Sequence, residues 1–387
     1  MSKKIVSLNG LRFFMIMVIV LIHFEEFVKN IPVFGNGFIN YFLPLGFFAT
    51  NFFFVLSGFG MMLSNIKSIP DDQLKCCSVK DSVKYGINHV KKIYPVYIAT
   101  VIYGLIWVFI ITAYTNELSK SFYLHEAINF LSHVFLVQSA TGMSFFTHHY
   151  NGVTWFLSSL FCIYILAPNL MYVLRKSAKS FFTDIVYFCL ELFFIVFTAV
   201  IFSKVENVCT GIKGIPNVDI LVYASPYRRV FYVLAGMSLA KIFIQVQDKI
   251  TTLKKASIFE ILAVVTTIIY SICRKKISDS NIVYLFDVLL LSLFVFVFSF
   301  DEGIISKFLS RPNIQKFGNM AMYMFLLHYL PYIPYFFVTS TMGKIKETNF
   351  TNLAFIVFDL AFTFVSSIII YKHDMAKKEK LLQTKQS

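Results

Sequence analysis

The segment LNGLRFFMIMVIVLIH, residues 8–23, places one arginine and one histidine in an otherwise almost entirely apolar run. With the residues that follow, it forms a stretch over 8–29 that is long enough to cross a bilayer as a helix. Arg12 and His23 are eleven residues apart, and eleven steps of about 100° return to within about 20° of the same direction. The sequence therefore predicts that both side chains share one helical face, ~16 Å apart along the axis.

The rest of the chain is equally apolar. Hydrophobic residues make up 57% of its 387 residues and charged residues only 14%, whereas soluble domains carry about 25% charged residues. Segments of spanning length recur along the whole chain. They lie at 8–29, 41–64, 93–113, 153–174, 182–202, 226–245, 256–273, 282–300, 316–338 and 351–371. The sequence therefore predicts an all-α, polytopic membrane helix bundle of about ten transmembrane helices.

A shorter segment, 127–140, contains several polar residues and suits a half-helix or re-entrant piece better than a full span. If this segment does not cross and both termini are cytoplasmic, most of the 35 Lys and Arg residues fall in inner loops. This distribution satisfies the positive-inside rule, with the Arg274–Lys276 triplet as the exception. We therefore expect a multi-pass protein of the cell membrane with cytoplasmic termini, a single membrane domain over 1–371 and a polar cytoplasmic tail over 372–387.

The net charge of +14 reflects these basic loops and does not indicate nucleic-acid binding, because the basic residues form no patch interleaved with aromatic ones. The spacing of the six cysteines predicts no metal site. The partner that composition does predict is the lipid bilayer.

Three arginines lie inside predicted spans, namely Arg12, Arg228 and Arg229. A charge inside the membrane costs at least about 2.5 kcal/mol, so each needs a partner or a function. For Arg228 and Arg229, snorkelling from a helix end and a functional role are equally good interpretations. For Arg12, the face shared with His23 favours function. Glu26, one turn beyond His23, is placed to orient the imidazole or to keep it basic.

A cation near the inner end of a helix and a titratable base farther out suit a transferase that takes an anionic donor from the cytoplasm. The alternative is a secondary transporter or flippase of a surface-glycan precursor, which would also have broken helices and intramembrane Arg and His. Such a transporter is expected to consist of two halves that resemble each other, and no internal repeat is evident here.

Six segments, in order along the chain, resemble the acyltransferase 3 family of membrane acyltransferases, which modify cell-surface polysaccharides. They are LNGLRFFMIMVIVLIH (8–23), NFFFVLSGFG (51–60), HVKKIYPVYI (89–98), WFLSSLFCIYILAP (155–168), SPYRRVFYVLAGM (225–237) and FGNMAMYMFLLH (317–328). The chain departs from the family pattern at two places. Many members carry an acidic pair where this sequence has Leu160 and Phe161, and two arginines where it has His89 and Lys92.

The resemblance implies an acyl-CoA donor, usually acetyl-CoA, and no permanently bound cofactor. It implies a carbohydrate acceptor, either a cell-surface polysaccharide or a lipid-linked sugar, with polysaccharide-assembly proteins as further partners. Arg12, Lys91 and Lys92 would then meet the phosphates of CoA at the inner face. His23 would be the catalytic residue, either as general base or as the covalent carrier of the acyl group.

Three further residues are candidates for a substrate-binding or structural role. Ser57 precedes Gly58 in a small-residue break of the second span, where we expect Gly58 to serve helix packing and leave the role of Ser57 open. Trp155 suits an interfacial anchor better than a ring that stacks on a sugar. His328 precedes Pro331 in an interrupted helix, where it either lines a cavity or is a hydrogen-bonded core residue at a kink.

Overall fold

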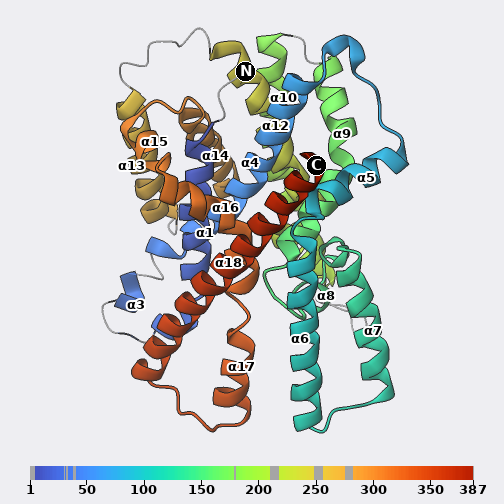
Figure 1. Cartoon of the computed structure of the whole chain (residues 1–387), viewed down its shortest axis with the longest axis vertical. Helices are drawn as coiled ribbons and strands as arrows, with labels where there is room; N and C mark the ends of the chain where they lie inside the picture. The colour runs from blue at the N-terminus through green and yellow to red at the C-terminus, as the bar shows by residue number, and fades with distance from the viewer. Residues whose placement is uncertain are drawn as a thin grey trace.

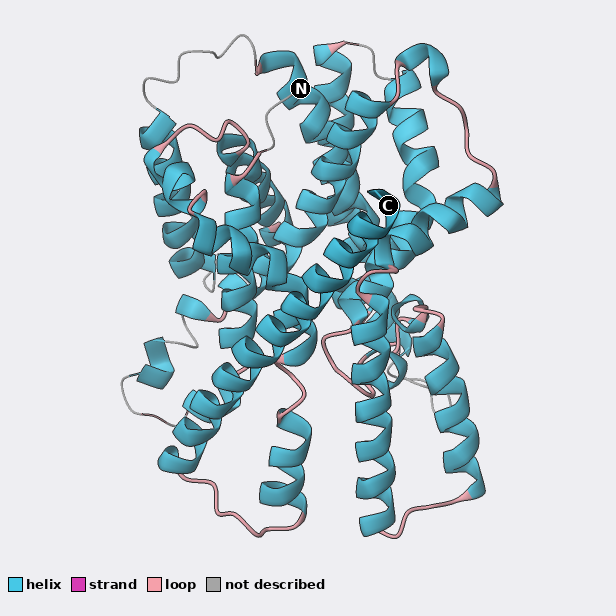
Figure 2. Cartoon of the chain, in the orientation of Figure 1, coloured by secondary structure: helices cyan, strands magenta, loops and turns pink. Residues whose placement is uncertain are grey.

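The computed structural model describes residues 5–29, 31, 34–37, 41–177, 180–209, 218–247, 256–274 and 282–386. Within these ranges the secondary structure is helical and contains no strand (Figure 2). Eight of the described helices are long and apolar enough to cross a membrane. The predicted all-α, polytopic bundle is therefore confirmed.

Each predicted span coincides with a helix. The long ones are α4 (Leu45–Ser68), α6 (Tyr94–Tyr114), α9 (Trp155–Ser177), α10 (Phe181–Cys209), α12 (Pro226–Val246, preceded by α11, Leu221–Ala224), α13 (Ala256–Arg274), α16 (Pro312–Leu327) with its continuation, and α18 (Asn349–Gln386). The other two predicted spans fall on α1 (Ser7–Ile22) and α14 (Val283–Phe298), which are apolar helices of 16 residues each. The remaining described helices are short or amphipathic.

Four segments differ in detail from the prediction. The first span does not continue to residue 29, since α1 ends at Ile22 and a separate turn, α2 (Glu25–Val28), follows. The ninth is interrupted after Leu327 and resumes as α17 (Tyr332–Phe336), because Pro331 and Pro334 lack the N–H group that a continuous helix needs. The segment 127–140 lies on α7 (Lys120–Val134) and the 3₁₀ turn Gln138–Thr141. The polar tail after residue 371 continues α18.

Helices α1, α4, α12 and α16 form the middle of the bundle, where α1 packs against α4 and α16, and α12 packs along α4. Helix α18 crosses the front of the molecule diagonally in Figure 1. Helices α6 and α7 run side by side as an antiparallel pair (Figure 1), with the rings of Phe109 and Phe122 5.3 Å apart. Helix α5 (Val79–Val90) packs against α9.

The start of α1 is fixed by groups at the end of α14 and directly after it. The backbone N–H of Ser7 donates to Asp301 Oδ1 over 2.9 Å, that of Val6 to Oδ2 over 3.3 Å, and Ser7 Oγ donates to the Phe298 carbonyl over 2.6 Å. A carboxylate here satisfies N–H groups that no helical carbonyl reaches, and it complements the positive end of the helix. These bonds set the level at which α1 places Arg12 and His23.

Two glycines allow α4 and α12 to approach closely. A Cβ atom on Gly58 would overlap the Val233 carbonyl, and one on Gly236 would overlap the Val55 carbonyl. Residues larger than glycine would therefore push the helices apart, so Gly58 serves the helix packing that the sequence predicts. The close crossing leaves the neighbouring Ser57 facing a cavity on another side of α4.

Of the basic triplet that departs from the positive-inside rule, Arg274 ends α13 and forms a 3.0 Å ion pair with buried Asp287. Lys275 and Lys276 lie outside the described residues. Arg274 thus has a structural partner within the bundle.

Candidate active site

His23 lies directly after the last turn of α1 and contacts a second histidine. Its Nδ1 atom is 2.6 Å from the carbonyl oxygen of Ile19, one turn earlier, and 3.3 Å from Nε2 of His328. The two imidazole rings have their centroids 4.9 Å apart. His328 is fully buried and follows the last residue of α16. The break in the ninth span therefore brings a histidine from the far end of the chain against His23.

The hydrogen bonds assign the tautomers of this pair. His328 Nδ1 lies 2.9 Å from the carbonyl of Phe325 and 3.2 Å from that of Met324. A carbonyl only accepts, so Nδ1 of each ring carries the proton. His328 Nε2 is then an acceptor for the Nδ1–H of His23, which it shares with the Ile19 carbonyl. Nε2 of His23 keeps a free lone pair, the form that a base or a nucleophile requires.

A wide cavity surrounds Arg12, toward the opposite end of α1. Its volume is about 990 Å³, at the upper end of the roughly 300–1,000 Å³ usual for ligand sites. Its walls come from α1, α4, α5, α9 and α16. The polar side chains that line it are Asn9, Arg12, Ser57, Ser64, Asn65, Lys67, Ser68, Tyr85, His89, Tyr164 and Asn319. This end of the bundle is the one that the basic residues predict to be cytoplasmic.

Charge in this cavity is of one sign. Arg12 and Lys67 line it, and no Asp or Glu does so among the described residues. Within the described part of the chain, Arg12 forms no ion pair and no hydrogen bond, although Tyr164 lies close enough to interact with it electrostatically. A half-buried guanidinium inside the membrane without a carboxylate is costly unless an anion joins it. The cavity is therefore suited to an anionic ligand.

Aromatic side chains from α5 and α9 form one wall of the cavity. The ring of His89 lies between Tyr85 and Tyr164, at centroid distances of 4.1 and 4.9 Å, and His89 Nδ1 is 2.9 Å from the Tyr85 carbonyl. Burial, together with nearby Tyr164, raises the pKa of Tyr85 to about 12. Its phenol therefore keeps its proton at physiological pH and can donate a hydrogen bond to a ligand.

Lys91 and Lys92 do not line the cavity. Lys91 is exposed, and its Nζ donates to Asn88 Oδ1 over 3.1 Å. Lys92 is also exposed, with Nζ 5.8 Å from the ring centroid of Tyr323. Their predicted contact with the donor remains a prediction.

Glu26 is not placed to orient the imidazole. It is exposed and forms an ion pair with Lys29, while the Ile19 carbonyl and His328 contact His23 Nδ1. The reason is that α1 ends at Ile22, so Glu26 belongs to a separate turn and no longer lies one helical turn above His23. The prediction for Glu26 is wrong in this respect.

Arg228 and Arg229 are each only 1% exposed, so snorkelling is wrong for both. Arg228 donates to the Val222 carbonyl and to Tyr232 Oη over 2.9 Å each, and Arg229 donates to the Tyr223 carbonyl and to Asn51 Oδ1. Both guanidinium groups lie over aromatic rings. They join the start of α12 to its neighbours.

Trp155 is part of the same aromatic cluster and is neither an interfacial anchor nor an open platform for a sugar. It is 4% exposed, and its ring centroid lies 4.8 Å from that of Tyr223 and 5.5 Å from the Arg229 guanidinium. Neighbouring side chains therefore bury the ring, which the apolar sequence around it could not reveal.

Several cavity residues were not singled out from the sequence. Tyr164 and His89 lie within segments that resemble the family, so a signal for them was present. Lys67 was missed because a lysine at the inner end of a span usually only sets the membrane topology. Tyr85 was missed because it lies on a polar, amphipathic helix. Only the packing of α5 against α9 shows that these residues meet Arg12 in one cavity.

These features define a helical membrane protein with an anion-suited cavity and a base-competent imidazole on one helix. The sequence model of the acyltransferase 3 family, described as an acyltransferase domain, matches residues 5–372. The chain belongs to this family and is a membrane acyltransferase. Neither a curated protein nor a solved structure matches it. Family membership favours the enzyme over the transporter or flippase.

Proposed function

We propose that this membrane acyltransferase moves a short acyl group, normally acetyl, from cytoplasmic acyl-CoA to a hydroxyl of a cell-surface polysaccharide or lipid-linked sugar. The proposal rests chiefly on the environment of Arg12. Its guanidinium has no carboxylate partner, lines a cavity without acidic residues, and lies on the same helix as His23. One helix thus connects a place for an anionic donor to a place for acyl-transfer chemistry.

Acyl-CoA fits the cavity by charge and by composition. Its phosphates would lie near Arg12 and Lys67, where a guanidinium can form paired hydrogen bonds with phosphate oxygens. The rings of Tyr85, His89 and Tyr164 offer surfaces for a planar base and donors for its polar atoms. Lys91 and Lys92, exposed beside this region, would attract the donor to the inner face.

In the first route, His23 acts as general base. Nε2 takes the proton of the acceptor hydroxyl while its oxygen attacks the thioester carbon. The C–O bond forms, the C–S bond breaks, and the imidazolium gives its proton to the CoA thiolate. The Ile19 carbonyl and His328 Nε2 both accept from Nδ1–H, so they stabilise the positive imidazolium and hold the ring in place.

In the second route, His23 Nε2 itself attacks the thioester and releases the CoA thiolate. The acyl group then stays on Nε2 until an acceptor hydroxyl attacks it. The C–O bond forms, the N–C bond breaks, and Nε2 takes the hydroxyl proton and passes it to the CoA thiolate. The same free Nε2 serves both routes, so they remain alternatives. In each, His328 acts as a positioning residue, because its own Nδ1–H is engaged with backbone carbonyls.

The test is transfer of a labelled acetyl group. Protein in lipid nanodiscs is supplied with labelled acetyl-CoA and glycan material from cells that lack the gene. Mass spectrometry should show the glycan gaining one acetyl group per modified sugar. Absence of transfer from acetyl-CoA and other acyl-CoA donors to every glycan fraction would contradict the proposed function.

A further inference from the structure

A narrow apolar seam lies between the Arg12 cavity and the histidine pair. Its volume is only about 10 Å³, and each residue lining it is apolar, namely Ile16, Ile19, Phe53, Phe156, Ala321, Met322 and Phe325. A site needs roughly 10–15 Å³ of such volume to hold one water molecule, together with polar partners. The seam is therefore dry and nearly closed.

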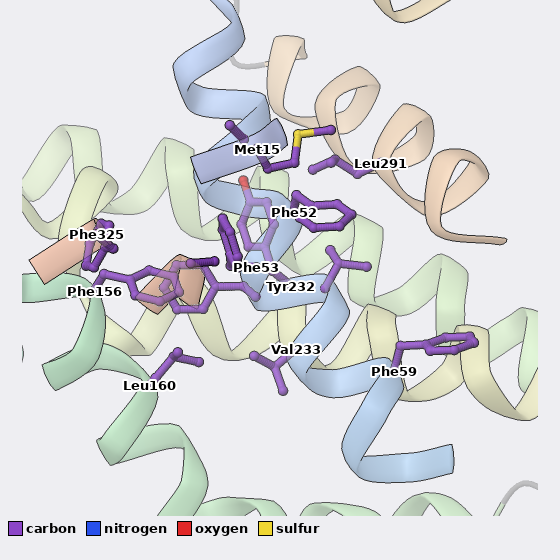
Figure 3. Packing of buried hydrophobic residues seen from close by; sticks show 14 of the residues in the cluster. Met15, Phe52, Phe53, Phe59, Phe156, Leu160, Tyr232, Val233, Leu291 and Phe325 are labelled. Carbon is purple, nitrogen blue, oxygen red and sulfur yellow. The ribbon is translucent and has the colours of Figure 1, made fainter. Parts of the chain in front are cut away.

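The seam is continuous with the cavity at one end. Phe53, Phe156 and Met322 line both spaces. Figure 3 shows Phe53, Phe156 and Phe325 gathered together, and their rings form a series with centroid distances of 6.1 Å between Phe53 and Phe156 and 5.3 Å between Phe156 and Phe325.

Two other residues that line the seam, Ile19 and Phe325, contact the histidines through their backbones. The carbonyl of Ile19 accepts from His23, and that of Phe325 accepts from His328. The Phe325 ring centroid is 6.1 Å from that of His328. Two residues that line the seam thus hold the two imidazoles through their backbone carbonyls.

We infer that this seam is the passage for the acyl end of the donor, and that its width, set chiefly by Met322, restricts the enzyme to short acyl groups. The inference rests on the proposed function, because it assumes an acyl-CoA in the Arg12 cavity. An apolar lining suits an acyl group and excludes water, which protects the thioester from hydrolysis. Met322 is partly buried and flexible, whereas the neighbouring phenylalanines are packed in the core.

Each additional methylene that a tight apolar site must accommodate changes selectivity by about 10- to 200-fold. Replacing Met322 by alanine removes most of the side chain that closes the seam. The ratio of kcat/KM for butyryl-CoA to kcat/KM for acetyl-CoA should therefore rise at least about 10-fold in Met322→Ala. Met322→Phe, which fills the seam, should lower kcat/KM for acetyl-CoA and lower kcat/KM for butyryl-CoA by a larger factor.

Met320→Ala is the matched control, since Met320 is a fully buried methionine on the same helix that lines neither space. It should leave the butyryl-to-acetyl ratio unchanged. An unchanged ratio in Met322→Ala, or an equal rise in Met320→Ala, would overturn the inference while leaving the proposed function intact. The proposed function is judged separately, by whether the wild-type protein transfers from acetyl-CoA at all.

Discussion

The two ends of helix α1 differ in how their charged or titratable groups are held. Arg12 lines a wide cavity and has no ion-pair or hydrogen-bond partner within the described residues. His23 lies in a tight environment where a backbone carbonyl and His328 fix its ring. A group left without partners is suited to bind a ligand, whereas a ring held by several contacts is suited to chemistry at a defined point. The difference supports our proposal that donor binding and acyl-transfer chemistry lie at separate places along α1.

The largest loss of activity is expected from substitutions of His23, whose ring is fixed by its contacts. His23→Ala should lower the rate of acetyl transfer by about 10²–10⁴-fold or more, because the base or the covalent carrier is lost. His23→Gln keeps hydrogen bonding without useful basicity and should be equally inactive. The rate is measured with labelled acetyl-CoA in nanodiscs. A folded His23→Ala protein with substantial transfer would show that α1 carries no catalytic group.

A smaller loss is expected at His328, which contacts His23 and which we propose acts only through it. His328→Ala removes the acceptor for His23 Nδ1–H and should lower kcat by about 10- to 100-fold, the range typical when an orienting partner is removed. KM for acetyl-CoA should change little, because His328 lies outside the donor cavity. His328→Asn, whose amide oxygen can accept, should recover part of kcat. A rise in KM with unchanged kcat would assign His328 to donor binding instead.

Stability gives a further test, because α4, which lines the cavity, crosses α12 closely. Gly58→Ala places a methyl group against the Val233 carbonyl and should destabilise the protein by about 1–3 kcal/mol. Gly60→Ala is the matched control, since a Cβ there meets nothing within 4 Å. When thermal unfolding is measured in detergent, Gly58→Ala should have a lower Tm than the wild type, and Gly60→Ala should not. Equal shifts for the two variants would mean that the crossing tolerates separation.

The smallest expected effect is on the pH dependence of stability. It concerns Glu126, a carboxylate with hydrogen-bond partners, whereas the Arg12 cavity has no acidic residue in its lining. Glu126 accepts from His149 over 2.7 Å and from Tyr150 Oη over 2.9 Å. Burial raises the pKa of Glu126, but these hydrogen bonds and the charge of His149 outweigh burial and leave the pKa below its ordinary value. The carboxylate therefore stabilises the folded protein above its unfolded-state pKa of about 4.3. This contribution is lost as pH falls through the lower, folded-state pKa.

Glu126→Gln should remove that part of the pH dependence. Between pH 3 and 6, Tm of the wild type should fall more steeply toward acid than Tm of the variant. The difference between the two curves isolates Glu126 from the other carboxylates. Parallel curves would show that the Glu126 hydrogen bonds do not contribute to the folded state.

The sequence predicted the features that depend on helical periodicity. The apolar segments fall on the observed helices, and the chain resembles the family to which it belongs. Arg12 and His23 could be paired because both lie on one helix. Glu26 was misplaced because the pattern gives no sign that α1 ends at Ile22. The contact between His23 and His328, and the cavity shared by Tyr85, His89 and Tyr164, join segments far apart in the chain. Periodicity within one segment cannot predict such contacts.

Calorimetric titration of CoA into Arg12→Ala and His23→Ala, both purified in the same detergent, tests the separation of binding from chemistry most directly. Arg12→Ala should lose at least about 10-fold in affinity, because hydrogen bonds to a charged group are worth about 1.5–3 kcal/mol. His23→Ala should bind CoA like the wild type. Arg12→Lys should recover affinity only in part, since an ammonium lacks the paired donors of a guanidinium. Wild-type affinity in Arg12→Ala, or an equal loss in both variants, would contradict the account.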